Sequence, residues 1–138
     1  MLLRNFHLKN IPELQFKRYF CYLTDQICAN MSVRVDQLVL VIDAYNFGYS
    51  QMYSGHIKQM LAFQRNCHSG RGYATIVLRG NMVFKSIQAI VSKLIDETQR
   101  NKVRLLGNKF HKSIQQLISP DNLPEEYGGT QMSLDNFI

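Results

Sequence analysis

The 138-residue sequence lacks any long apolar run, which limits where the protein can reside. Its longest apolar stretches, such as residues 38–42, hold about five residues, whereas a membrane-spanning helix needs about 20. The apolar stretch that follows Met1 is also too short for a secretory signal. We therefore expect no membrane-spanning segment and a cytoplasmic location.

Cysteine is scarce, and its spacing excludes the common metal-binding patterns. The three cysteines form no CxxC pair, and no histidine stands at a metal-ligand interval from Cys21, Cys28 or Cys67. Cys21 and Cys28 are seven positions apart, on one face of a helix, which is typical of small core residues. The sequence thus predicts no metal site, and its cysteines agree with a cytoplasmic protein.

Signatures of catalysis are absent too. The chain has no GxSxG, P-loop, HExxH or complete dinucleotide fingerprint, and His7, His56, His68 and His111 are widely scattered. Asp43 ends a predicted strand, a position where open α/β sheets place functional groups. It has no obvious Ser or His partner, so we expect it to organise its loop. The sequence therefore predicts that the protein is not an enzyme and needs no cofactor.

What the sequence does contain is an alternation of strand and helix patterns. Apolar positions at helical spacing predict helices over residues 13–31, 52–67, 83–94 and 110–118, with Asn81 as an N-cap and a further helical turn at 96–98. Short apolar and β-branched runs predict strands over residues 38–42 and 73–78, of a type buried on both faces, and a third strand over residues 103–106. A strand–helix–strand order favours a right-handed crossover between parallel strands.

We therefore predict a single α/β domain over residues 1–138, with a mostly parallel sheet covered by helices. Residues 1–12 form a leading strand or loop, residues 13–130 the core and residues 131–138 a tail. The proline-punctuated segment after residue 118 is expected to be polar and extended.

Positive charge is concentrated in one segment. Between Arg71 and Lys112 there are nine Lys or Arg residues against only Asp96 and Glu97. This segment carries a net charge of +7, whereas the whole chain carries +6. Such a cluster indicates an anionic partner: a membrane, an acidic protein or a nucleic acid. Few aromatic residues are interleaved with these cations for base stacking, so we expect no nucleic-acid binding.

Five segments in this order resemble the CRAL-TRIO family, the cytosolic carriers of tocopherol, retinaldehyde and phosphatidylinositol. They are Val39 to Asp43, Ala74 to Leu78, Phe84 to Leu94, Val103 to Asn108, and the closing Leu123-Pro124-Glu125-Glu126-Tyr127-Gly128-Gly129. The resemblance covers about residues 33–130 and is most specific in the closing motif. The chain departs from the family at His68-Ser69 and at Arg79-Gly80-Asn81, and the family's preceding helical bundle is missing.

The resemblance implies a mobile gate helix over a hydrophobic pocket. The gate stripe comprises Val83, Phe84, Ile87, Ile90, Val91 and Leu94, and further pocket candidates are Ile42, Tyr45, Met52, Met60 and Phe63. Tyr49 and Ser50 are candidates for contact with a ligand head group. An ordinary core helix shows the same stripe, so packing remains the alternative for each of these residues.

The resemblance also implies a phosphoinositide site beside the gate. Two positions that bind phosphate in the tocopherol-carrier branch fall on Arg71 and Lys102, while two others fall on Tyr73 and Thr98, which are not basic. Arg100, Lys93 and Arg104 are close enough in sequence to compensate.

Together these features predict a protein that binds a hydrophobic small molecule or lipid and carries or presents it at phosphoinositide-containing membranes, with transient peripheral attachment. The alternative is an interaction or regulatory module that keeps the fold without a working pocket. The sequence does not determine the ligand or the oligomeric state.

Overall fold

A computed structural model of the chain describes residues 8–32, 37–49, 55–56, 58–59, 62–63 and 70–134. The chain divides into two compact units, Met1–Leu105 and Leu106–Ile138. Of the expected leading strand or loop over residues 1–12, residues 1–7 lie outside the described residues, and Leu8–Asn10 form a 3-10 helix.

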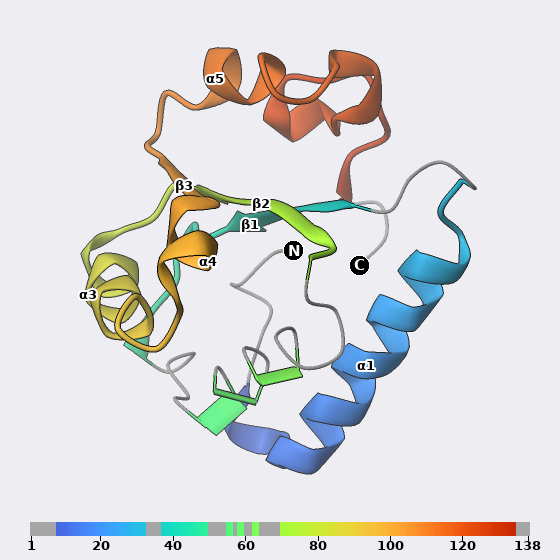
Figure 1. Cartoon of the computed structure of the whole chain (residues 1–138). Helices are drawn as coiled ribbons and strands as arrows, with labels where there is room; N and C mark the ends of the chain where they lie inside the picture. Colours follow the sequence, from blue (N-terminus) through green and yellow to red (C-terminus); the bar gives the residue numbers. More distant parts are fainter. Residues whose placement is uncertain are drawn as a thin grey trace. The chain divides into compact units, whose positions relative to one another are not determined.

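The first unit contains a three-stranded sheet in the order β1-β2-β3. β1 (Leu38–Asp43) pairs in parallel with β2 (Gly72–Leu78), as Figure 1 shows, and β2 neighbours β3 (Val103–Leu106). Parallel neighbours require a crossover connection, which is usually helical. The predicted strands and the α/β architecture are thereby confirmed.

β1 and β2 are buried mainly toward their carboxyl ends. Ile76, Val77 and Leu78 of β2 are almost fully buried, whereas Val39 and Tyr73, near the amino ends, are 42% and 57% exposed. The expectation of strands buried on both faces is therefore wrong for the amino ends. An apolar run indicates that a strand can be covered, but how far the cover extends depends on distant segments of the chain.

Helix α1 (Glu13–Ala29) agrees with the helix predicted over residues 13–31. It contacts His56 and Phe63, and the described residues 55–56, 58–59 and 62–63 are helical as predicted. The Phe16 ring meets the His56 ring edge to face at 5.1 Å between centroids, and the Phe20 and Phe63 rings do so at 5.7 Å. Within the described part of the chain, no helix is both long and apolar enough to cross a membrane.

Helix α3 (Met82–Val91) follows β2, and its first turn is capped as expected. The Asn81 Oδ1 atom accepts a hydrogen bond from the Phe84 N–H at 3.0 Å, which satisfies one of the free donors at a helix start. The predicted turn at 96–98 is the start of α4 (Glu97–Asn101), where Asp96 caps the Gln99 N–H at 2.7 Å.

The second unit forms a small core of its own. Helix α5 (His111–Gln115) is shorter than predicted, and two 3-10 helices follow it, Pro120–Asn122 and Glu125–Tyr127. The expectation of an extended tail is wrong, because apolar side chains within it are buried. The buried residues of this unit are Phe110, Ile114, Leu123 and Tyr127, and the Phe110 and Tyr127 rings meet edge to face at 6.0 Å.

The closing motif folds back on itself through its backbone. The Pro124 carbonyl oxygen accepts hydrogen bonds from the N–H groups of Tyr127 and Gly129 at 3.0 and 3.1 Å. Gly128 has φ +82°, a left-handed conformation that favours glycine, and a Cβ atom on Gly129 would lie 1.9 Å from the Leu123 carbonyl oxygen. Glycine is therefore required at position 128 by the backbone conformation and at position 129 by the lack of space for a side chain.

Replacing Gly129 with alanine should destabilise the second unit. The added methyl group would press on the Leu123 backbone, and such overpacking costs about 1–3 kcal/mol of unfolding free energy. The matched control is Gly107→Ala, because a Cβ at Gly107 meets nothing within 4 Å; it should change stability by less than about 0.5 kcal/mol. Urea denaturation followed by circular dichroism measures both, and equal stability of the two variants would contradict this account.

Candidate functional site

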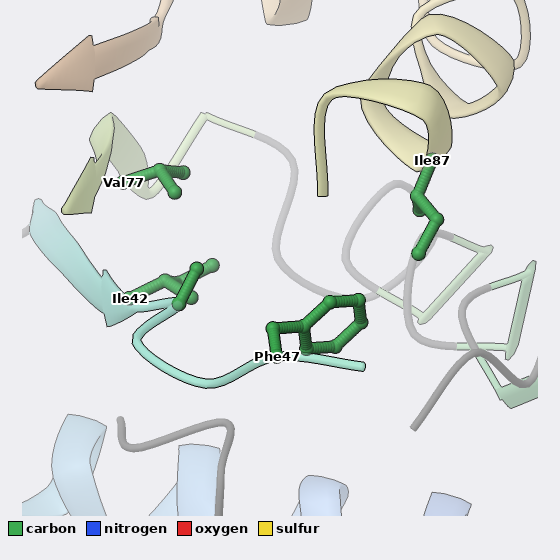
Figure 2. Packing of buried hydrophobic residues seen from close by; sticks show 5 residues of the cluster. Ile42, Phe47, Val77 and Ile87 are labelled. Carbon is green, nitrogen blue, oxygen red and sulfur yellow. The ribbon is translucent and has the colours of Figure 1, made fainter. Parts of the chain in front are cut away.

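An apolar cluster joins α3 to the carboxyl ends of β1 and β2. We name it the α3 cluster: its buried members are Ile42, Ala44, Phe47, Val77 and Ile87, and Leu40, Val83, Phe84 and Val91 pack against them. Figure 2 shows Ile42 and Val77 on the strands, Ile87 on α3, and the Phe47 ring between them in this view. Ile42 pairs with Val77 across the strands, and paired residues project to the same face of a sheet. The α3 cluster therefore marks the face that α3 covers.

The predicted gate stripe divides into an inner and an outer part. Val83, Phe84, Ile87 and Val91 face the α3 cluster. Ile90 is 54% exposed and Leu94, which lies beyond the end of α3, is 47% exposed. Met82 adds a third large apolar side chain to the surface of this helix, at 83% exposed. The helix thus has an apolar inner face and isolated apolar residues on its outer side.

Asp43 holds the carboxyl ends of the two parallel strands together. Its side chain is only 2% exposed, and Arg79 contacts both of its oxygens, with the Nε–Oδ1 pair at 3.0 Å. The Tyr45 N–H donates to Oδ1 at 2.9 Å, and the Arg79 guanidinium carbon lies 4.6 Å from the centre of the Tyr45 ring. A buried carboxylate requires such an opposite charge and hydrogen bonds. The expected loop-organising role of Asp43 is therefore what the geometry shows.

Asn81 connects the loop after β1 to the first turn of α3. While its oxygen caps α3, its Nδ2 group donates to the Phe47 carbonyl oxygen at 2.6 Å. The Phe47 and Phe84 rings then meet edge to face at 5.7 Å. The sequence pattern predicted the cap but not the second bond, because Phe47 is distant in sequence.

The structure places the pocket candidates in several locations. Ile42, Phe84, Ile87 and Val91 come together in the α3 cluster, whereas Tyr45 is exposed beside Arg79 and Phe63 packs against α1. Tyr49 is exposed, and Met52, Met60 and Ser50 lie outside the described residues.

Sequence reasoning missed four members of the α3 cluster: Leu40, Ala44, Phe47 and Val77. The two-residue alternation of a strand places Leu40 on the same face as Ile42, so this signal was available. Phe47 lies in a loop, where no periodicity applies.

Arg71 and Lys102 are brought close to each other at the amino ends of β2 and β3. The Lys102 Nζ donates to the Gly72 carbonyl oxygen at 2.6 Å, directly beside Arg71 in the chain. An ammonium group has three donors, so this bond leaves others for an anion. Arg100 is exposed on α4, where its Nη2 lies 3.3 Å from the Ile95 carbonyl oxygen. Lys93 and Arg104 are also exposed.

An α/β fold with parallel strands and a helix that covers an apolar sheet face is the arrangement that the resemblance predicted. Residues 1–129 match the CRAL/TRIO domain, and the chain belongs to this family. A CRAL-TRIO domain-containing protein of Schizosaccharomyces pombe is 28% identical over 96 residues, which are 69% of this chain and 21% of that protein.

The crystal structure of Sfh5 confirms the fold. Its superposition gives a TM-score of 0.73 at 20% sequence identity and covers 97% of this chain. The chain spans 46% of Sfh5 and about a fifth of the Schizosaccharomyces pombe protein.

Truncation of Ile87 should destabilise the first unit far more than truncation of Ile90. Ile87 is buried in the α3 cluster, and replacing it with alanine removes apolar contacts and leaves a cavity, at a cost of about 2–5 kcal/mol. Ile90→Ala, one turn away on the outer side, should cost less than about 1 kcal/mol. Urea unfolding of the two variants measures the difference, and similar losses would contradict the division of the stripe.

Proposed function

We propose that this chain binds a hydrophobic small molecule or lipid between α3 and the sheet and carries or presents it at membranes. The observation that carries the proposal is the α3 cluster, in which one apolar helix face closes on one apolar sheet face. Membership of the CRAL/TRIO family supports it. The proposed activity is binding and transfer without chemistry, by a cytoplasmic protein that attaches to membranes transiently.

Burial of hydrocarbon supplies enough free energy for such binding. Each methylene removed from water contributes about 0.8 kcal/mol, so about ten buried methylenes give roughly 8 kcal/mol. That value corresponds to a dissociation constant of about 1 µM before the entropic costs of association are counted. No ionic contact is required, which fits a site whose members are almost all apolar.

In this proposal α3 is the gate. Ile87 is buried in the same cluster as Ile42 and Val77, so in this proposal a ligand enters when α3 moves away from the sheet. The exposed side chains of Met82, Ile90 and Leu94 would then meet the apolar part of a bilayer, as the apolar residues of interfacial helices do. A membrane would thereby favour the open position of α3.

The basic residues supply the attraction to an anionic surface. Arg71, Lys102 and Arg100 would contact the phosphates of a phosphoinositide head group, with Lys93 and Arg104 nearby in the chain. Each basic residue near such a surface contributes about 1 kcal/mol. The proposed partner is therefore a membrane that contains phosphoinositides.

A second candidate is an interaction or regulatory module that keeps the fold without a ligand pocket. The same α3 cluster favours it, because Ile42, Val77 and Ile87 fill the interior with their own side chains. The two candidates differ in whether α3 leaves the sheet for a ligand.

Lipid recovery from the purified protein distinguishes these candidates. Organic extraction and mass spectrometry of protein made in several hosts should recover an apolar compound in an amount close to that of the protein. Leu40→Phe, which adds volume beside the α3 cluster, should lower the recovered amount several-fold, whereas Val39→Phe on the opposite face should not. An empty wild-type protein from every host would reject the first candidate in favour of the second.

Neutralising two exposed cations should weaken binding to vesicles that contain phosphatidylinositol bisphosphate. The pair Arg71→Gln and Arg100→Gln removes about 2 kcal/mol of attraction, or roughly 30-fold in affinity at low salt. The control is Lys17→Gln with Arg18→Gln, two exposed cations of α1. Vesicle sedimentation measures both, and equal losses for the two pairs would reject a localised site.

A further inference from the structure

The two ends of α3 are held very differently. At its start, Asn81 caps the helix and bonds the Phe47 carbonyl oxygen, and the Phe84 ring packs on Phe47. At its far end Val91 still packs against the α3 cluster, but the described hydrogen bonds are local, such as Leu94 N–H to the Val91 carbonyl oxygen at 2.8 Å, and Leu94, just beyond the helix, is exposed. This asymmetry indicates where the helix can move.

The fixed end depends on an unusual backbone conformation at Arg79. Its φ of +55° lies in the left-handed region, which is unfavourable for arginine and persists only where neighbouring contacts enforce it. Here the contacts are the two bonds to buried Asp43 and the stacking on Tyr45. The ion pair therefore holds Arg79 in the conformation that leads into α3.

Gly80 lies between this ion pair and the helix cap. A Cβ atom at Gly80 would meet the Phe84 ring at 3.3 Å, so the chain passes close to the helix there. Glycine also has the widest choice of backbone angles, which makes it the natural point of rotation. A rotation about Gly80 that opens α3 must break the Asn81–Phe47 hydrogen bond and separate the Phe84 and Phe47 rings. The Asp43–Arg79 pair holds the chain on both sides of these contacts, at Tyr45 and at Arg79, and so resists that rotation.

We propose that Asp43 and Arg79 form a latch that fixes the start of α3, so that the helix opens by pivoting about Gly80 and the latch sets the rate of ligand release. Only the statement about ligand release rests on the proposed function. Asp43 and Arg79 are positioning residues, because they act through the loop and the helix rather than on a ligand.

Arg79→Asn tests the latch while preserving the backbone. Asparagine tolerates a left-handed conformation, so the substitution removes the ion pair without adding strain. The matched control is Lys85→Asn, which removes one exposed charge from α3 itself. A second variant, Asp43→Asn with Arg79→Asn, removes both charges and avoids an unpaired buried carboxylate, which protects the test if the single variant folds poorly.

Amide hydrogen exchange measures the opening of the start of α3 without any ligand. In Arg79→Asn and in the double variant, the amides of residues 44–48 and 82–85 should exchange at least about tenfold faster, while those of residues 74–77 in β2 stay unchanged. Lys85→Asn should leave all three segments unchanged. Equal acceleration in β2 and α3, or none in α3, would overturn the proposal, because the pair would then be a general stabiliser or irrelevant to the helix.

Release of a fluorescent phosphatidylcholine to acceptor vesicles measures whether the latch sets the rate of ligand release. Arg79→Asn should release this probe at least about fivefold faster than the wild type, and Lys85→Asn should match the wild type within about twofold. An unchanged release rate beside faster exchange at residues 82–85 would overturn the rate-setting role. A wild type that never takes up the probe would count against the proposed function, and the exchange data would still decide the latch.

Discussion

A buried carboxylate must find a cation, and in this chain that requirement determines the geometry around it. Asp43 ends β1 and Arg79 follows β2, so their ion pair fastens the carboxyl ends of two parallel strands. An unpaired charge at this depth would cost several kcal/mol. Pairing Asp43 with Arg79 accounts for the left-handed backbone at Arg79 and for its position over the Tyr45 ring. The same pair fixes where α3 starts.

The apolar cluster depends on the same fastening. α3 starts at Met82, three residues after Arg79, so the position of its cap Asn81 decides which face of the helix meets the sheet. Ile87 then joins Ile42 and Val77 in the α3 cluster, whereas Met82 and Ile90 remain exposed on the helix. A tightly held start and a lightly held end suit a helix that must open without leaving the fold, which is the property that the proposed carrier function needs.

Most of the secondary structure was predictable, because helices and strands of this chain carry clear periodicity and capping residues. The sequence predicted helix starts at Asn81 and Asp96 and a strand over residues 38–42. The folded tail was mispredicted, since its prolines outweighed Leu123 and Tyr127 as signals, although both are buried. The Asp43–Arg79 pair joins residues 36 positions apart and has no local signature, so only the fold reveals it. The stripe of α3 indicated an inner face, but the limits of that face depend on the width of the sheet it covers.

The central claim is that a hydrophobic ligand occupies the space between α3 and the sheet. Methyl NMR spectroscopy tests it most directly, by titrating the delipidated protein with a soluble short-chain phosphatidylcholine and following the methyl signals of Ile42, Val77 and Ile87. Ile114, buried in the second unit, serves as the internal reference. The account predicts saturable shifts of the three cluster methyls with Ile114 unchanged. Shifts confined to exposed Ile90 and Leu94, or no shifts at all, would contradict it.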